Sequence, residues 1–226
     1  MKIGKVRGVL ITHDHADHIK AAGKLSKDLR LPVFATAAVH AGMDRNWQAT
    51  VKVPEEYRHA ITPGTAFTLG EFNIEPFSLP HDASENVGYH ITVGDIRLTL
   101  MTDVGAVTDN MKHYIGQSTH LILESNYDEK MLADGRYPEV LKQRIASGTG
   151  HLSNNQAALA LATNCRPTLQ HVWLCHLSEE NNTPDKALQT MEDTLRKHNI
   201  EVGTDFKLDA LRRKIPTNPF VLGSDK

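Results

Sequence analysis

Three histidines and two aspartates lie within six consecutive positions, residues 13–18, one residue after the apolar run Val9-Leu10-Ile11. Carboxylates crowded at the end of a strand repel one another and resist burial unless a cation neutralises them. Imidazole nitrogens and carboxylate oxygens together suit zinc or manganese, and the lack of cysteine among them disfavours a structural zinc site. The segment therefore predicts one or two bound divalent cations, and with them a metalloenzyme.

Three more residues of the same chemical kind each follow a predicted strand: His81, Asp103 and His176. Taken singly, each has an ordinary alternative, because a lone histidine is more often structural and Asp103 precedes a glycine-containing turn. Strand ends that meet at one edge of a sheet can, however, gather such side chains around a metal. Together with residues 13–18, the pattern favours the metal-site interpretation for all three.

The elements that must position these residues alternate between strand-like and helix-like segments, as in an α/β or α+β sandwich. Strands are expected at residues 6–12, 31–35, 65–69, 72–79, 87–93, 96–101, 120–123 and 171–175. Helices are expected at residues 19–29, 37–43, 128–132, 138–147, 154–164 and 184–198. The Gly94-Asp95 dipeptide predicts a hairpin turn. The basic stretch 207–214 and the tail after it look peripheral.

The composition is that of an ordinary globular protein, with 226 residues, 40% hydrophobic and 23% charged. The net charge of −2 provides no global basic field for nucleic acid, although bound metals could supply positive charge for a phosphate. The sequence has no apolar run near the roughly 18 residues of a membrane span, no signal peptide, and too few cysteines for a disulfide framework. We expect one cytoplasmic domain over residues 1–226 that does not bind membranes.

The order of the ligand-type residues resembles that of the metallo-β-lactamase-fold hydrolase superfamily, whose HxHxDH motif appears here at residues 13–18. The seven matching positions are His13, His15, Asp17, His18, His81, Asp103 and His176. The resemblance implies an α/β fold, the αββα sandwich, with two divalent metal ions, zinc or manganese. It assigns His13, His15 and His81 to one metal, Asp17, His18 and His176 to the other, and Asp103 as a bridge.

Three further segments are similar to the YycJ family, also called WalJ or VicX: residues 124–128, 150–154 and 176–182. Members of that family are bacterial cytosolic proteins regarded as DNA exonucleases. The Gly-His-x-Ser sequence that begins at Gly150 is also similar to one in transfer-RNA 3′-processing and phosphodiesterase relatives, where the histidine lies beside the scissile phosphate. The resemblance thus implies a phosphodiester hydrolase.

Two residues in these segments have alternative interpretations. His151 precedes Ser153, a good N-cap for the helix expected at 154–164, and it could simply pack near that cap. Alternatively, it could lie near a phosphate at the positive end of the helix, where it would stabilise charge or protonate the leaving group. Glu124 could hold a ligand histidine in place, or it could be an ordinary strand-end carboxylate.

The expected reaction is metal-assisted hydrolysis of a phosphodiester by water, which Asp17 or Asp103 could orient. The catalytic residues are therefore predicted to be Asp17, Asp103 and His151, with DNA favoured over RNA as the substrate. Two alternatives remain open. One is a hydrolase of small thioesters or lactones with the same fold, and the other is a metal-binding protein without catalytic activity.

The superfamily normally has several strands before its HxHxDH motif, whereas the motif here begins at residue 13. The resemblance therefore implies a sandwich that is incomplete at its N-terminal sheet. An exposed sheet edge would then need cover from another arrangement or from an oligomeric partner.

Overall fold

The computed structural model describes residues 6–223, and these divide into two compact units. Unit 1 contains the described residues up to Ser78 together with Asp82–Tyr89, and unit 2 contains Leu79–His81 and the chain from His90 onward. The single domain expected over residues 1–226 stays a prediction. No helix within residues 6–223 is long and apolar enough to cross a membrane.

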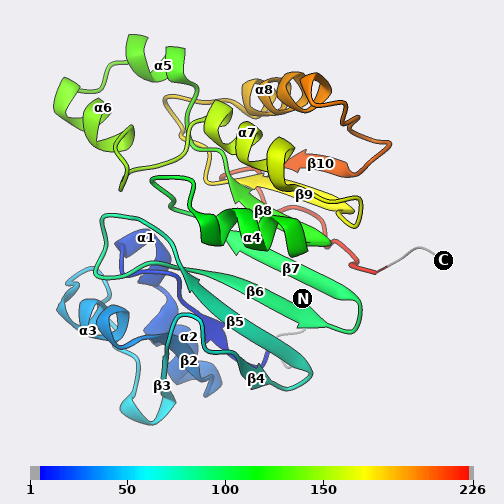
Figure 1. Cartoon of the computed structure of the whole chain (residues 1–226). Helices are drawn as coiled ribbons and strands as arrows, with labels where there is room; N and C mark the ends of the chain where they lie inside the picture. Colours follow the sequence, from blue (N-terminus) through cyan, green and yellow to red (C-terminus); the bar gives the residue numbers. More distant parts are fainter. Residues whose placement is uncertain (1–5, 224–226) are drawn as a thin grey trace. The chain divides into compact units, whose positions relative to one another are not determined.

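Unit 1 contains a small parallel sheet with the strand order β1-β2-β3 (Figure 1). Its strands are β1 (Val9–Leu10), β2 (Val33–Thr36) and β3 (Arg58–Ile61), preceded by the short 3-10 helix η2 (Glu55–Tyr57). Its helices are α1 (Ala16–Ile19), α2 (Ala22–Leu29) and α3 (Ala37–Arg45). Apolar side chains from these elements form one buried cluster that includes Ile11, Ile19, Val33, Val39 and Met43.

A hairpin completes unit 1, in which β4 (Phe67–Leu69) pairs antiparallel with β5 (Phe72–Ser78). Gly70 in the turn has φ +64°, a left-handed conformation that residues other than glycine rarely adopt. Two hydrogen bonds fix the chain just before the histidine segment of residues 13–18. The Thr12 carbonyl accepts a hydrogen bond from Val87 N–H at 3.1 Å, and the fully buried Tyr89 hydroxyl donates to the Ile11 carbonyl at 2.6 Å.

Unit 2 is built on a parallel sheet of β7 (Ile96–Met101), β8 (His120–Glu124), β9 (His171–Cys175) and β10 (Lys207–Ala210), in the order β10-β9-β8-β7. The two middle strands are buried on both faces, as expected for a parallel sheet with covered faces, and Leu121, Leu123, Val172 and Leu174 are fully buried. β6 (Val87–Val93) is joined to β7 by the predicted Gly94-Asp95 turn.

Three helices of unit 2 pack beside this sheet: α4 (Asp109–Gln117), α7 (Asn154–Asn164) and α8 (Pro184–Lys197) (Figure 1). The contact between α7 and α8 is made by small and apolar side chains such as Ala157, Leu161 and Met191, all fully buried. Two shorter helices, α5 (Glu129–Asp134) and α6 (Glu139–Ile145), lie between β8 and α7 in the sequence. The predicted cap is confirmed, because Ser153 and Gln156 form a reciprocal capping box at the start of α7.

Some expected boundaries are wrong. The strand expected at residues 6–12 is only Val9–Leu10, because the chain turns after Ile11 into the histidine segment. The helix expected at residues 19–29 is two helices, and the first of them begins earlier, at Ala16.

Four elements are absent from the sequence predictions: η2, β3, α4 and β10. Residues 207–214 were expected to be peripheral, but they begin with β10, which pairs in parallel with β9. In β10 the half-buried Leu208 and Ala210 alternate with charged residues, which is the period-two pattern of an edge strand. The basic character of the stretch obscured this alternation.

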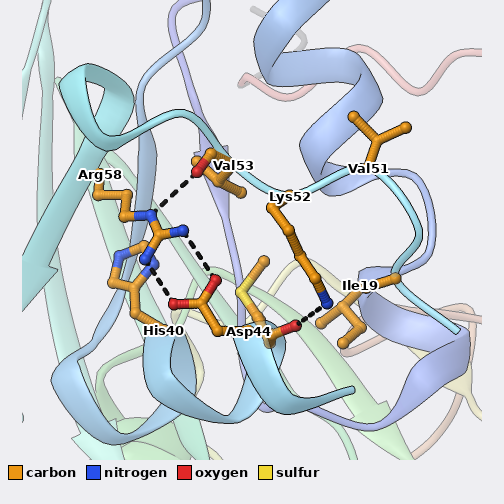
Figure 2. Close-up of a pocket in the computed structure, with 9 residues that line it drawn as sticks. Ile19, His40, Asp44, Val51, Lys52, Val53 and Arg58 are labelled. Atoms are coloured by element: carbon orange, nitrogen blue, oxygen red, sulfur yellow. Dashed lines mark hydrogen bonds and ion pairs between the residues drawn. The ribbon is translucent and has the colours of Figure 1, made fainter. Parts of the chain in front are cut away.

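Figure 2 shows a small pocket in unit 1, lined by residues that include Ile19, His40 and Val53. Its free space of about 10 Å³ is enough for one water molecule, so it is not a ligand site. Beside it, the Arg58 guanidinium donates two hydrogen bonds to the Asp44 carboxylate, at 2.7 and 2.8 Å. The hydrogen bonds from Arg58 lower the pKa of Asp44 below its ordinary value.

This ion pair predicts a pH-dependent stability difference between the wild type and Asp44→Asn. The folded-state pKa of Asp44 lies below the unfolded value, so the pair stabilises the fold above the unfolded pKa and is lost as the pH falls through the folded pKa. Asp44 is partly exposed, and screening limits the expected loss at pH 7 to about 1 kcal/mol. Urea unfolding from neutral to acidic pH should show the two proteins converging in acid. A difference that persists or grows there would contradict the assignment.

Candidate metal centre

Three functional side chains of unit 2 lie at one edge of the sheet because their strands are parallel neighbours. In the register, Met101 of β7 pairs with Leu123 of β8, and Leu123 pairs with Leu174 of β9. Asp103 lies two positions after Met101, and His176 lies two positions after Leu174. Glu124 lies one position after Leu123. The sheet register therefore brings together residues that are far apart in the sequence.

Asp103 and His176 both have backbones in the left-handed region, with φ values of +57° and +55°. Residues other than glycine seldom adopt this conformation, and it costs on the order of 1–3 kcal/mol unless the surroundings impose it. Such strain is concentrated at functional sites. Here it occurs at two of the seven positions that the sequence predicts as metal ligands.

The rings of His81 and His176 are oriented alike: Nδ1 contacts an oxygen atom that can accept a hydrogen bond, and Nε2 faces Asp103. His81 Nδ1 lies 2.9 Å from the Gly150 carbonyl oxygen, and His176 Nδ1 lies 2.8 Å from Glu124 Oε1. Carbonyl and carboxylate oxygens only accept hydrogen bonds, so each Nδ1 carries the proton. The Nε2 atoms of the two rings then face Asp103 Oδ1, at 3.6 and 3.5 Å.

This convergence fits a divalent cation. In the neutral rings each Nε2 carries a lone pair, and two lone pairs facing a carboxylate oxygen repel unless positive charge lies among them. Asp103 is almost completely buried, so water screens this repulsion little. Hydrogen bonds from Nδ1 to a carbonyl or a carboxylate are also the usual way in which proteins orient histidine ligands. His81, Asp103 and His176 therefore have the chemistry and the orientation to hold a metal.

Glu124 is the residue around which this part of the site is organised. It is fully buried, and its Oε1 accepts hydrogen bonds from the Nδ1 atoms of His151 and His176, at 2.9 and 2.8 Å. Its Oε2 accepts from the backbone N–H groups of Val104 and Leu152, at 2.8 and 3.2 Å. Burial alone raises the pKa of Glu124, but the hydrogen bonds from His151 and His176 outweigh it and lower the pKa to about 2. Glu124 is thus an ionised carboxylate that orients two histidines.

His151 lies among the predicted ligands. One donor atom each from Asp103, Glu124, His151 and His176 lies within 4.8 Å of the others. The His151 ring centroid is 5.1 Å from that of His81 and 5.2 Å from that of His176. The His151 Nδ1 is bonded to Glu124 rather than to the helix cap, and the catalytic role expected for His151 stays a prediction.

In unit 1 the HxHxDH segment forms a compact group of imidazoles. His15 is the N-cap of α1, so Asp17 and His18 lie in the first turn of that helix. The His13 ring, which is fully buried, has its centroid 4.7 Å from that of His15 and 4.2 Å from that of His18. The His18 Nε2 lies 3.5 Å from Asp17 Oδ2. The ligand sets predicted for two metals draw on both units, and the joint site stays a prediction.

Asp14, the aspartate of this segment with no predicted role in the metal site, anchors it. Its carboxylate accepts hydrogen bonds from the backbone N–H and the hydroxyl of Ser84, at 3.1 and 2.5 Å. A β-carbon on Gly42 would come within 1.7 Å of Asp14 Oδ2, so only glycine fits beside this carboxylate. His15 Nε2 makes a 3.1 Å contact with the Asp82 carbonyl. These contacts tie the histidine segment to residues 82–84.

The role of Glu124 was left open by the sequence and is settled by the structure in favour of a partner for a ligand-type histidine. Glu124 bonds to His151 and His176, which are 27 and 52 positions away in the sequence. The residues next to Glu124 in the sequence therefore do not indicate this role. The buried amides of Asn126, Asn154 and Asn182 also bond to residues far away in the sequence, and the sequence analysis did not single them out individually. The only available signal was the resemblance of the segments 124–128, 150–154 and 176–182 to one family.

Comparison with known proteins identifies the class. Residues 2–176 match the model of a family described as the beta-lactamase superfamily domain. Solved structures with a similar fold include the metallo-beta-lactamase fold protein YhfI from Bacillus subtilis, with TM-score 0.66, 17% identity, and coverage of 92% of this chain and 76% of that one. Unliganded yeast PDE1 gives TM-score 0.65, 13% identity, and coverage of 92% and 67%. The fold and its donor set define a metallo-β-lactamase-fold hydrolase, which implies divalent metal ions and confirms the predicted fold class.

Two curated relatives identify the family within this class to which the chain belongs. Exodeoxyribonuclease YycJ of Bacillus anthracis is 35% identical over 221 residues, which cover 96% of this chain and 81% of the relative. Exodeoxyribonuclease WalJ of Streptococcus pneumoniae strain D39 is 34% identical over 200 residues, which cover 88% and 74%. The chain belongs to the YycJ/WalJ family of metallo-β-lactamase-fold proteins, as its sequence segments predicted.

Proposed function

We propose that this protein is a cytoplasmic exonuclease that hydrolyses DNA phosphodiesters with two divalent metal ions, zinc or manganese. The proposal assigns His13, His15 and His81 to one ion and Asp17, His18 and His176 to the other, with Asp103 as the bridge. The observation that carries it is the convergence of His81 Nε2 and His176 Nε2 on the buried Asp103 carboxylate. The names of the curated relatives support DNA as the substrate.

The bound ions would lower the pKa of the attacking water and offset charge on the phosphoryl oxygens. The chain's own residues supply the rest. Asp17 or Asp103 would accept a hydrogen bond from the attacking water and orient it. His151 keeps its Nδ1–H on Glu124, so its Nε2 is the atom available to a phosphate oxygen or to the leaving oxygen. There, as an imidazolium with a second proton on Nε2, it would donate the Nε2 proton to the leaving oxygen as the bond from that oxygen to phosphorus breaks.

The function can be tested with the purified 226-residue chain. We would remove metal with a chelator, restore zinc or manganese, and measure hydrolysis of end-labelled DNA and of bis-p-nitrophenyl phosphate. The proposal predicts two equivalents of bound metal and loss of both activities without metal. Activity on thioesters or lactones alone would establish the competing small-molecule hydrolase. Metal binding without turnover of any substrate would indicate a non-catalytic protein, and failure to bind either metal would overturn the central claim.

Replacement of His151 by alanine tests its proposed role. General-acid catalysis typically contributes 10²–10⁴-fold, so DNA hydrolysis should fall by about 100-fold or more, with metal content unchanged. Hydrolysis of bis-p-nitrophenyl phosphate should fall much less, because p-nitrophenolate leaves without needing a proton. His113→Ala, at an exposed position of α4, is the matched control. Equal losses on both substrates would exclude leaving-group protonation, and unchanged DNA hydrolysis would exclude any catalytic role.

A further inference from the structure

Four buried polar residues of unit 2, Asn126 through its backbone carbonyl and the others through their side chains, form a hydrogen-bonded set that we call the amide clasp: Ser125, Asn126, Asn154 and Asn182. Each is at least nine-tenths buried. The residues come from three separate loops, after β8, at the start of α7, and after β9. These are the loops that contain or adjoin Glu124, His151 and His176. The clasp therefore lies directly behind the candidate metal centre.

Asn182 is the centre of the clasp. Its amide nitrogen donates to the backbone carbonyls of Ser125 and Asn126, at 2.9 and 3.0 Å, and lies 2.9 Å from Asn154 Oδ1. Asn154 returns a hydrogen bond from its own amide nitrogen to Asn182 Oδ1, at 3.0 Å. The Ser125 hydroxyl donates to Asn154 Oδ1 at 2.6 Å. Each of the two amides thus donates to and accepts from members of the clasp, and Asn182 Oδ1 also accepts from the Thr183 N–H at 2.9 Å.

Asn126 connects the clasp to the histidines. Its side-chain amide donates to the His176 carbonyl at 2.7 Å, and its own carbonyl accepts from the Ser178 N–H at 2.7 Å. Its backbone N–H donates to the Leu152 carbonyl at 3.0 Å, next to His151. One residue thus bonds to both of the chain segments that contain these histidines. His176, whose carbonyl accepts this hydrogen bond from Asn126, has a φ of +55°.

We propose that the amide clasp is a positioning device that holds His176 in its left-handed conformation and keeps His176 and His151 within reach of Glu124. A buried polar network of this kind is rigid when every member is bonded, and each lost partner leaves unpaired groups that favour rearrangement. The clasp acts through His176 and touches neither metal nor substrate. The proposal rests on His176 being a metal ligand, as set out under the proposed function.

The decisive comparison is between Asn182→Ala and Asn181→Ala. The two asparagines are adjacent in one loop and almost completely buried, but the side-chain amide of Asn181 makes no hydrogen bond to any described residue. Loss of an interaction behind a metal ligand typically costs 10–100-fold in affinity. Competition with a chromophoric chelator should therefore show metal binding at least about 10-fold weaker in Asn182→Ala and within about twofold of wild type in Asn181→Ala.

Two further measurements keep the proposal testable if Asn182→Ala folds poorly. Asn154→Asp removes a single donor to Asn182 at the N-terminus of α7, where a negative charge is tolerated, and it should weaken metal binding in the same direction. In the metal-free variants, ¹⁵N shifts of the His176 ring should show partial loss of the Nδ1–H tautomer, which general destabilisation of the fold would not produce. Wild-type metal affinity and tautomer in folded Asn182 or Asn154 variants would overturn the proposal.

Failure of the amide-clasp proposal can be distinguished from failure of the proposed nuclease function. A wild-type protein that binds metal tightly but degrades no DNA would refute the nuclease assignment, and the clasp would still be judged on metal affinity alone. A wild-type nuclease whose Asn182→Ala variant binds metal normally would refute the clasp and leave the nuclease assignment standing.

Discussion

Replacement of Asp103 by alanine is expected to abolish phosphodiester hydrolysis and to remove bound metal. The carboxylate is the common partner of His81 Nε2 and His176 Nε2, so without it no negative charge remains between the two rings. Because Asp103 is a proposed ligand rather than a residue behind one, the loss of affinity should exceed the 10–100-fold typical of outer partners. Activity on bis-p-nitrophenyl phosphate should fall by at least the same factor.

Metal analysis by mass spectrometry and steady-state kinetics would measure both effects on the same preparation. Asp109→Ala is the matched control, since Asp109 lies in the first turn of α4 with an almost fully exposed side chain. Folding of the Asp103 variant can be verified by its unfolding transition without metal. An Asp103→Ala protein that keeps its full metal content and its turnover would show that the site is assembled differently.

Replacement of Glu124 by glutamine is expected to lower both the stability of the fold and its affinity for metal. Each carboxylate oxygen of Glu124 accepts two hydrogen bonds, whereas a glutamine amide presents N–H donors in place of one of those oxygens. Two buried donors then lose their acceptor, at a cost of roughly 1–3 kcal/mol each. We expect a loss of about 2–6 kcal/mol in the free energy of unfolding, and metal affinity lower by about 10–100-fold.

Urea unfolding of the metal-free proteins separates the stability effect from the effect on metal binding. Glu139→Gln, at an exposed position of α6, makes the same chemical change without burial and should behave like wild type. A Glu124→Gln protein within about 1 kcal/mol of wild type, with unchanged metal affinity, would exclude the organising role given to this carboxylate.

The chemistry of the site was readable from residue types and spacing alone. Three histidines and two aspartates within residues 13–18 predict a metal wherever they fold, because such groups cannot be crowded together without a cation. The strands before Asp103 and His176 were also found, since β7 and β9 have the bounds that their apolar runs predict. Local periodicity is enough to define such elements.

Tertiary structure alone decided which side chains support the ligands. Glu124 meets His151 and His176 only because β7, β8 and β9 are parallel neighbours in one particular register. The bonds that Asn182 makes to Ser125 and Asn126 likewise span 57 and 56 residues. Hydrogen bonds between distant residues depend on strand order and register, which sequence periodicity does not encode. The sequence thus predicted a bound metal, and the fold determined which carboxylate and amides are hydrogen-bonded around the histidines expected to bind it.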